Sequence, residues 1–596
     1  MSLPILLGLL ALSPVYAKDV LETIEVDATK DVERFTFSDS TTISRKEIEE
    51  KNSAVATELL TNESSLVVSQ SGGPGSQTSF FLRGTDSSHI MFSIDGLKMH
   101  DTSAPGRSFD AAYFTSPLLN EIQIHKGPQP VLFGSDAIGG MVEFKTRKGG
   151  EKPETRLTIN GGSFGTIDGT LSSDWNAKNH QGTLTFTQFH TDGISRLNKK
   201  RHDAKEDDAT DITQVTSSSS HHWAKKIQTD LLLSYLHASA EYDGQNSSSQ
   251  DVDRAGDYTK TDQYITQQKT TIELSKNQSI SIRNGLNRLV RLDENLDFGK
   301  SNFDSNFIQH ELLHRGEWKN FGLLSGLSTE HEGAESAYEK ERSIDQTSLF
   351  SQAALNLNNW NFHIGGRLEE HSRYGTFTTG SGGISFGFGK NKIFTQYSQG
   401  FKAPSLYQLY GSWGVGNRDL DPETNDSALL GWERKTETLE TAITLFKNSF
   451  SKMLTYAGGT YVNQKHFVSE GIELSGKYRL RQIHFYGNYT YQDFKKNEDP
   501  VLRRPHNIAV LGMSYFPVET IEFNLKGSFF SSREDKVGTN FVKLNGYEVL
   551  DLGVKKTWDK DAVGIEIKNI LDREYENIYG YSTMPRSVFG HYSHTF

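Results

Sequence analysis

Alternation of apolar and polar residues constrains this chain more than any other feature of its sequence. It recurs in strand-length segments from about residue 155 to the end, between clusters of Gly, Asn, Asp and Ser. In "IHFYGNYTY" (483–491), Phe485 and Tyr491 share one face, whereas Asn488 and Thr490 fall on the other. The same pattern appears in "GTLTFTQF", "LETAITLF", "TIEFNL" and "AVGIEI". A period of two residues predicts β-strands that are apolar on one face and polar on the other.

The environment of the apolar faces separates two β folds. In a soluble sandwich they point inward, whereas in a membrane barrel they face lipid and the polar faces line the lumen. The last segment, "SVFGHYSHTF", places Val588, Tyr592 and Phe596 on one face and ends on the aromatic residue. It resembles the terminal strand of outer-membrane barrels, so the membrane barrel is favoured.

The length of the alternating region sets the size of the barrel. At about 20 residues per tilted strand with its connection, residues 151–596 suffice for about 22 antiparallel strands. A barrel of that size encloses a lumen that needs a plug. Residues 31–150 differ in texture, with Gly-rich turns and a predicted helix at "SRKEIEEKNSAVATELL" (44–60). We expect them to form a compact α+β domain.

The N-terminal segment "MSLPILLGLLALSPVYA" (1–17) has the apolar run and small-residue site of a signal peptide. We predict export, with cleavage after Ala17. Met1-Ser2 offers no Lys or Arg, so the start of the signal is expected further upstream. After Ala17 no run of about 18 apolar residues occurs, which excludes a helical membrane span.

Composition excludes several functional classes. The chain has no Cys, which rules out disulfides, thiolate nucleophiles and Cys-based metal sites. A formal net charge of −12 argues against nucleic-acid binding. The sequence contains no G-x-S-x-G, H-E-x-x-H or Walker motif, so an enzyme with a catalytic cofactor is not supported.

Five motifs in order resemble those of TonB-dependent outer-membrane receptors. They are "FFLRGTDSSHIMFSIDGLKM" (80–99), "IQIHKGPQPVLFGSDAIGGMVEFKT" (122–146), "GFKAPSLYQLYG" (400–411), "NRDLDPET" (417–424) and "IKNILDREYENIYGY" (567–581). The resemblance covers nearly the whole chain.

The resemblance implies an all-β membrane protein of the Gram-negative outer membrane, a monomer whose barrel of about 22 strands carries an N-terminal α+β plug in its lumen. Its parts would be a signal peptide (1–17), a TonB-box segment (18–30), a plug (31–150) and the barrel (151–596). Arg83 and Lys126 of the plug are candidates for buried pairs with carboxylates of the barrel wall, the alternative being solvated surface cations.

A short segment near the predicted mature N-terminus resembles the TonB box. It is formed by Glu22, Thr23, Ile24, Glu25, Val26, Asp27 and Ala28. Its β-forming residues lack an internal strand to pair with, so TonB, driven by its inner-membrane energising complex, would add a strand there.

Within the family, the stretches "GGPGSQTSFFLRGTDSSH", "LFGSDAIGG", "FKAPSLYQLYG", "VLRRPHN" and "NIYGY" most resemble the cobalamin-receptor branch. By position, that resemblance implies ligand contacts at Ser71, Gln77, Ser79, Asp86, Ala104, Pro105, Gly106 and Arg503.

The same branch holds calcium in acidic extracellular loops, and "KEDDATD" (205–211) and "YDGQNSSSQDVDRAGD" (242–257) are similarly acidic. Closely spaced carboxylates suit Ca²⁺, which takes six to eight oxygen ligands. The expected ligands are Asp207, Asp208, Asp211, Asp251 and Asp253. Solvated acidic loops are the alternative interpretation.

Other cargoes and one other class remain open. A ferric siderophore, haem or another metal chelate is an alternative ligand. Haem receptors of this family usually carry a histidine between the "FKAP"-like and "NRDLDPE"-like motifs, and none occurs between Pro404 and Asn417. A passive porin or adhesin would share the barrel but lack residues 18–150 as interpreted here.

Overall fold

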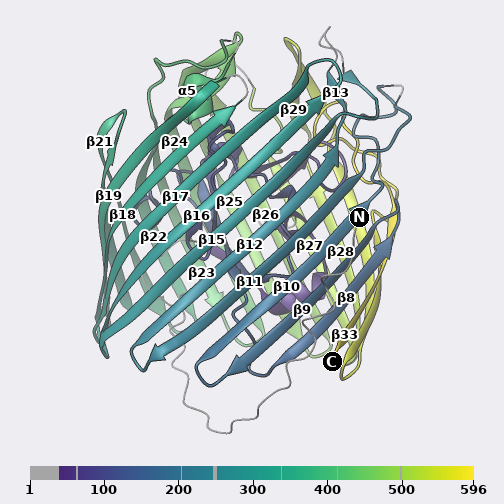
Figure 1. Ribbon diagram of the computed structural model, residues 1–596. Helices are drawn as coiled ribbons and strands as arrows, with labels where there is room; N and C mark the ends of the chain where they lie inside the picture. The colour runs from purple at the N-terminus through teal and green to yellow at the C-terminus, as the bar shows by residue number, and fades with distance from the viewer. Residues whose placement is uncertain are drawn as a thin grey trace.

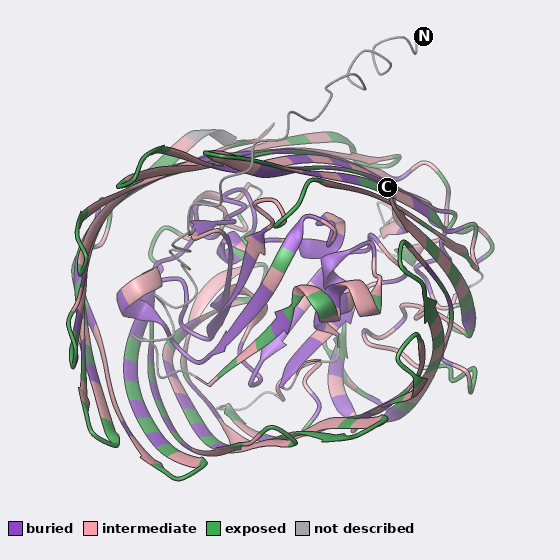
Figure 2. Ribbon diagram, turned by 90° about the horizontal axis from the view of Figure 1, so that it is seen from below, coloured by how far each residue is buried: buried purple, intermediate pink, exposed green. Residues whose placement is uncertain are grey.

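The computed structural model describes residues 39–61, 63, 65–202, 204–245, 251–336, 339–412, 414–496 and 500–596. The predicted signal peptide and the segment resembling a TonB box lie outside the described residues. The described chain forms a barrel with a second domain inside its lumen (Figures 1 and 2).

The barrel is one closed antiparallel sheet of 22 strands, so the strand number predicted from length is confirmed. It closes where the last strand pairs with the first, with Phe589 opposite Gly162. In chain order the strands are β8 (Glu154–Gly162), β9 (Ile167–Ala177), β10 (His180–Thr191), β11 (Thr210–Ala224), β12 (Ile227–Glu241), β15 (Tyr258–Ser275), β16 (Gln278–Asn295), β17 (Gly299–Glu317), β18 (Phe321–Ser336), β19 (Glu339–Leu357), β20 (Trp360–His371), β21 (Gly375–Phe388), β22 (Asn391–Lys402), β23 (Glu423–Lys435), β24 (Leu439–Ala457), β25 (Thr460–Leu480), β26 (Ile483–Lys496), β27 (Asn507–Val518), β28 (Ile521–Phe530), β31 (Tyr547–Thr557), β32 (Asp561–Lys568) and β33 (Ser587–Thr595).

Closure explains why strands can carry this chain through lipid: every backbone group finds a partner on a neighbouring strand and no edge remains. The side chains follow the predicted alternation. Phe485 and Tyr491 are 43% and 44% exposed on the outer face, whereas Thr490 is fully buried in the lumen. Leu184 and Phe186 on β10 are likewise exposed, and Thr185 between them is buried. The apolar faces therefore point to lipid.

The two ends of the barrel differ in their connections. At one end, tight turns such as 178–179, 225–226 and 276–277 join the strands. At the other, long connections carry α5 (Leu406–Tyr410) and the small hairpins β13 (Gly244–Gln245) with β14 (Asp251–Val252) and β29 (Arg533–Val537) with β30 (Asn540–Leu544), at the top of Figure 1. Outer-membrane barrels keep short turns in the periplasm, so the long connections are extracellular.

The domain in the lumen is built around a five-stranded sheet of order β1-β6-β7-β4-β5. Its strands are β1 (Ser40–Ser44), β4 (Ile90–Ile94), β5 (Leu97–Lys98), β6 (Leu119–Lys126) and β7 (Gly140–Thr146), beside the pair β2 (Leu66–Gln70) and β3 (Thr78–Leu82). Short helices complete it: α2 (Arg45–Lys51), α3 (Ala56–Leu60), α4 (Pro130–Phe133), η1 (Ser87–His89), η2 (Pro105–Arg107) and η3 (Ala111–Tyr113). Among the described residues, no helix is long and apolar enough to cross a membrane.

The single helix predicted for residues 44–60 is wrong in one respect. Ser44 caps α2 through a capping box, but Asn52 adopts a left-handed conformation (φ 46°) and ends the helix. Val55 then bridges to Thr115, and α3 begins only at Ala56. The apolar periodicity continues across the break because both helices pack onto the same core, so the pattern alone does not reveal it.

The core of this inner domain extends to the barrel wall. Ile122, Ile124 and Phe144 of its central strands are fully buried, and the same cluster includes Leu232 and Phe307 of the lumen face. The inner domain therefore fills the lumen as a plug (Figure 2).

Charged groups fasten the plug to the wall. Arg83, whose side chain is 1% exposed, lies 2.8 Å from Glu473 on β25, and Lys126 lies 3.3 Å from the same carboxylate. The predicted pairing of these two cations with the barrel is confirmed. Arg83 also reaches Asp39 at 2.8 Å, at the start of the described chain.

The Arg83–Glu473 pair generates a prediction about plug retention. Arg83→Ala removes the closer of the two cations that pair with the buried Glu473 carboxylate, and breaking a buried pair costs about 3–5 kcal/mol. Single-barrel conductance in planar bilayers, recorded against urea concentration, should therefore show earlier plug release. The matched control is Lys46→Ala, because the exposed Lys46–Glu50 pair at 3.7 Å contributes little. Equal urea midpoints for both variants would contradict the role of the buried pair.

Candidate ligand site and extracellular cation site

Three plug loops reach the extracellular end of the barrel: residues 71–77 between β2 and β3, the η1 turn and the η2 turn. Their contacts on the wall stand where strands enter the long connections. These contacts are Thr210, Arg504 and Ser405. The three loops therefore form the floor of the lumen on its outer side, where a ligand arriving from outside first meets the plug.

The first loop carries three of the predicted ligand residues. The Ser71 N–H donates to the Gln77 carbonyl over 3.2 Å and closes the loop. Gln77 is exposed, and Ser79, on β3, is half-buried. Of these residues, Gln77 is the most accessible to an incoming ligand.

Of the other plug residues predicted to contact a ligand, Asp86 and Gly106 are tied to the wall. Asp86 caps η1 and lies 3.0 Å from Arg504, and although burial opposes its charge, Arg504 lowers the pKa of Asp86 to about 2. The Gly106 N–H donates to the Ser405 hydroxyl over 3.1 Å. Ala104 is buried and Pro105 is exposed. The carboxylate of Asp86 thus stays ionised and engaged.

Arg503 stands in the β26–β27 connection, and its guanidinium donates to Asp535 over 2.9 Å. Its neighbour Arg504, which sequence reasoning missed, is the arginine that contacts the plug. The pair of adjacent arginines in "VLRRPHN" contains no signal that distinguishes them. The structure distinguishes them by their partners: Arg503, with φ 63°, pairs with Asp535, whereas Arg504 pairs with Asp86 of the plug.

Carboxylates gather in two extracellular connections. Glu206 and Asp208 of the β10–β11 connection and Asp243 of the β12–β15 connection place one carboxylate oxygen each within 4.8 Å of one another. Asp253 lies beside them, accepting from the Ser195 hydroxyl at 3.1 Å and the Glu206 N–H at 3.3 Å. The cluster joins loops that are distant in sequence.

The predicted calcium ligands fall into two groups. Asp208 belongs to the cluster and Asp253 adjoins it. Asp211 does not join, because β11 has already begun and its alternation turns the carboxylate to the outer face, 2.9 Å from His190. Asp207 is exposed and turned toward the Ser195 N–H, and Asp251 is exposed on β14. Those three residues are outside the cluster as the structure has it.

Sequence reasoning missed Glu206 and Asp243, although both stand within the acidic stretches. Burial and mutual repulsion distinguish them. Burial, then the charges of Asp208 and Asp243, raise the pKa of Glu206 to about 8, and burial, then Asp243, raises that of Asp208 to about 7. Glu206 Oε1 and Asp208 Oδ1 are buried without hydrogen-bond partners.

These carboxylates suit a hard cation. They offer anionic oxygens from two loops, two of those oxygens lack other partners, and a bound divalent ion would remove the repulsion that raises their pKa. With the pKa of Glu206 raised to about 8 and that of Asp208 to about 7, an ion that binds there near neutral pH would compete with protons.

The cluster is coupled to the plug through its neighbour Arg196. The Arg196 N–H donates to Asp208 over 2.7 Å, and the side chain packs on Gly72, where an ideal Cβ would lie 2.6 Å from its Cγ. The Arg196 carbonyl accepts from Ser582 N–H of the β32–β33 connection over 2.7 Å. A change in the position of the acidic loops would therefore move Arg196 against the plug loop of residues 71–77.

Comparison with known proteins agrees with this geometry. The family model "TonB dependent receptor-like, beta-barrel" matches residues 154–570, and the "TonB-dependent Receptor Plug Domain" matches residues 33–141. The fold is similar to those of many solved structures, among them the following three, each at 12–13% identity.

The siderophore receptor PirA from Acinetobacter baumannii has a TM-score of 0.80, with 94% of this chain and 98% of that one covered. The FrpB iron transporter from Neisseria meningitidis (F3-3 variant) has a TM-score of 0.81, with 94% of this chain and 99% of that one covered. The ferripyoverdine receptor of Pseudomonas aeruginosa has 0.79, with 94% and 87% covered. With both family models matched in order on one barrel and its plug, this chain belongs to the TonB-dependent receptors, transporters of the outer membrane.

Proposed function

We propose that this receptor binds cobalamin or a related corrinoid at the cell surface and imports it by TonB-dependent transport. Membership of the family makes it an outer-membrane transporter and not an enzyme. The corrinoid is supported by the motifs that resemble the cobalamin-receptor branch. The observation that carries the proposal is the carboxylate cluster of Glu206, Asp208 and Asp243, placed in extracellular loops beside the outer plug loop.

Calcium would act on the geometry of the outer face. An ion held by carboxylates of the β10–β11 and β12–β15 connections would draw the two loops together and fix Arg196 against Gly72. If calcium orders the extracellular loops before the ligand binds, less of the binding free energy is lost to loop ordering. Calcium is therefore expected to raise ligand affinity without contacting the ligand.

A ferric siderophore, haem or another metal chelate is the second candidate cargo. It is favoured by the names of the similar structures, a siderophore receptor, an iron transporter and a ferripyoverdine receptor. Haem is the weakest of these, since no histidine stands between Pro404 and Asn417. A passive porin or adhesin is disfavoured, because the plug occupies the lumen.

Equilibrium binding to the purified receptor separates these ligands. We expect cobalamin to bind, and to bind about ten-fold more tightly with calcium than with chelator, about 1.4 kcal/mol. Asp208→Asn combined with Asp243→Asn should abolish the calcium effect. The matched control is Asp211→Asn, a carboxylate outside the cluster that pairs with His190. Binding of haem or a ferric siderophore, with none of cobalamin at micromolar concentration, would overturn the corrinoid.

We further propose that residues 22–28 are where TonB attaches, supported by their resemblance to a TonB box and by family membership. The described chain begins at Asp39, which contacts Arg83, so a pull on the N-terminal segment arrives at a plug–wall contact. The outer membrane has no energy source of its own, and force must come through such a contact.

Ile24→Pro tests this attachment. Proline removes a ladder N–H and fixes the backbone, so strand addition by TonB should fail. Energised uptake of labelled ligand by whole cells should be lost, whereas ligand binding stays at the wild-type level. The matched control is Thr29→Pro, which lies just beyond residues 22–28. Undiminished uptake by the Ile24→Pro variant would refute the assignment.

A further inference from the structure

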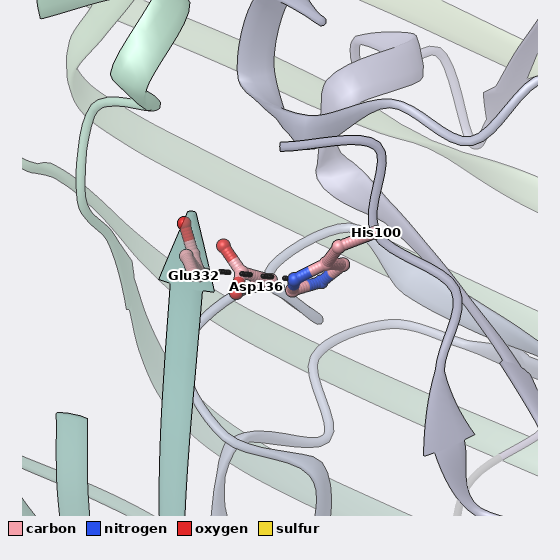
Figure 3. A group of neighbouring side chains, drawn as sticks. All are labelled: His100, Asp136 and Glu332. Carbon is pink, nitrogen blue, oxygen red and sulfur yellow. Dashed lines mark ion pairs between the residues drawn. The ribbon is translucent and has the colours of Figure 1, made fainter. Parts of the chain in front are cut away.

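A second cluster of possible metal ligands lies deep in the lumen, where the plug meets β18 (Figure 3). His100 follows β5 and Asp136 follows α4, both on the plug, whereas Glu332 belongs to the barrel wall. The three residues are 3%, 2% and 1% exposed. His100 Nε2 lies 3.6 Å from Asp136 Oδ2, and Nδ1 lies 3.9 Å from Glu332 Oε1.

Each member of the trio contributes a buried atom that has no hydrogen-bond partner. These atoms are His100 Nδ1, Asp136 Oδ2 and Glu332 Oε1. The separations between imidazole and carboxylates are too long for direct hydrogen bonds. Native proteins rarely bury polar atoms without a partner, and three facing one another indicate that something lies between them.

The other oxygen of each carboxylate is held by a cation. Asp136 Oδ1 lies 3.0 Å from Lys402, and Glu332 lies 2.6 Å from the Arg107 Nε. The His100 ring packs edge-on against Phe307, with centroids 4.9 Å apart. These neighbours fix the three side chains with their free atoms turned inward, as outer-shell partners do around metal ligands.

We propose that His100, Asp136 and Glu332 bind one divalent transition-metal cation of the Zn²⁺ type at this seam between plug and wall. One imidazole nitrogen with two carboxylate oxygens is a ligand set that zinc accepts, whereas calcium and magnesium prefer oxygen alone. Ligands about 2.1 Å from a tetrahedral ion stand about 3.4 Å apart. His100 would bind through one ring nitrogen, and one ligand atom of each residue lies within 4.8 Å of the other two, so the trio needs to close by at most about 1.4 Å.

The surrounding charge limits how tightly the ion is held. Arg107 and Lys402 touch the two carboxylates, and Lys98 lies nearby, paired with Glu330 at 2.8 Å. These cations already neutralise much of the local negative charge, so a divalent ion adds positive charge in a buried place. Affinity should therefore be lower than in a closed four-ligand structural zinc site.

The position of the site gives the ion a function. Two ligands move with the plug and the third belongs to β18, so the complete site exists only while the plug is docked. An ion that binds the docked state alone stabilises that state. Displacement of the plug separates the ligands and releases the ion, whatever the cargo is.

The test uses the full-length receptor in detergent, stripped with chelator and then saturated with calcium to occupy the extracellular cluster. Zn²⁺ is titrated and counted by elemental analysis, and Co²⁺ is titrated in parallel because its visible absorption reports ligand type and geometry. We expect one ion per wild-type chain, with affinity reduced at least about ten-fold in His100→Gln and in Glu332→Gln.

Two controls isolate the site. His331→Gln alters the neighbouring residue on β18, whose ring faces outward and pairs with Asp345 at 2.7 Å. Asp208→Asn alters the extracellular cluster. Both should bind as wild type does. A difference in electrophoretic migration between unheated and heated samples verifies that each variant has a folded barrel. The number of ions bound by the wild type is measured without reference to any variant. No ion in the wild type, or unchanged affinity in either buried-site variant, overturns the proposal.

Discussion

Pairing of buried charges across the plug–wall seam is the constraint on which the rest of the structure depends. A barrel of 22 strands has a polar lumen too wide for its own side chains to fill, and a second domain must occupy it. Contacts such as Arg83–Glu473, Arg107–Glu332 and Lys98–Glu330 join the two bodies, with each partner buried. A buried charge that loses its partner is costly, so these pairs fix one orientation of the plug more than they add stability.

The same constraint shapes the way the molecule can transport. The plug closes the lumen as long as its pairs are intact, and its outer loops face the extracellular end of the barrel. At the other end of this network, Asp39 joins Arg83, and Arg83 joins the wall. Under the proposed function, ligand binding at the outer loops and force on the N-terminal segment would both act on contacts between plug and wall, which is what coupling between two sites requires. When the plug separates from the wall, water can hydrate the charged groups of the seam, which lowers the free-energy cost of separation.

The sequence predicted the features that repeat or that belong to the family pattern. Alternation identified outward residues such as Phe485 and inward ones such as Thr490, because strand geometry leaves each side chain only two directions. The buried pairing of Arg83 and Lys126 was also predictable. What the sequence could not resolve depended on where strands and helices end. Asp211 lies outside the carboxylate cluster because β11 starts one residue earlier, and the break at Asn52 lies within a continuous apolar pattern. Glu206 and Asp243 became visible only when two loops were brought together.

The measurement that tests this account most directly is energised uptake with the plug tethered to the wall. Thr102 on the plug and Ser305 on β17 have hydroxyl oxygens 3.0 Å apart, and the native chain has no cysteine to interfere. In a Thr102→Cys, Ser305→Cys double variant, a disulfide would hold the two bodies together. We expect normal ligand binding, loss of energised uptake while the disulfide is intact, and recovery of uptake on reduction. Uptake at the wild-type rate with the disulfide intact would contradict this expectation.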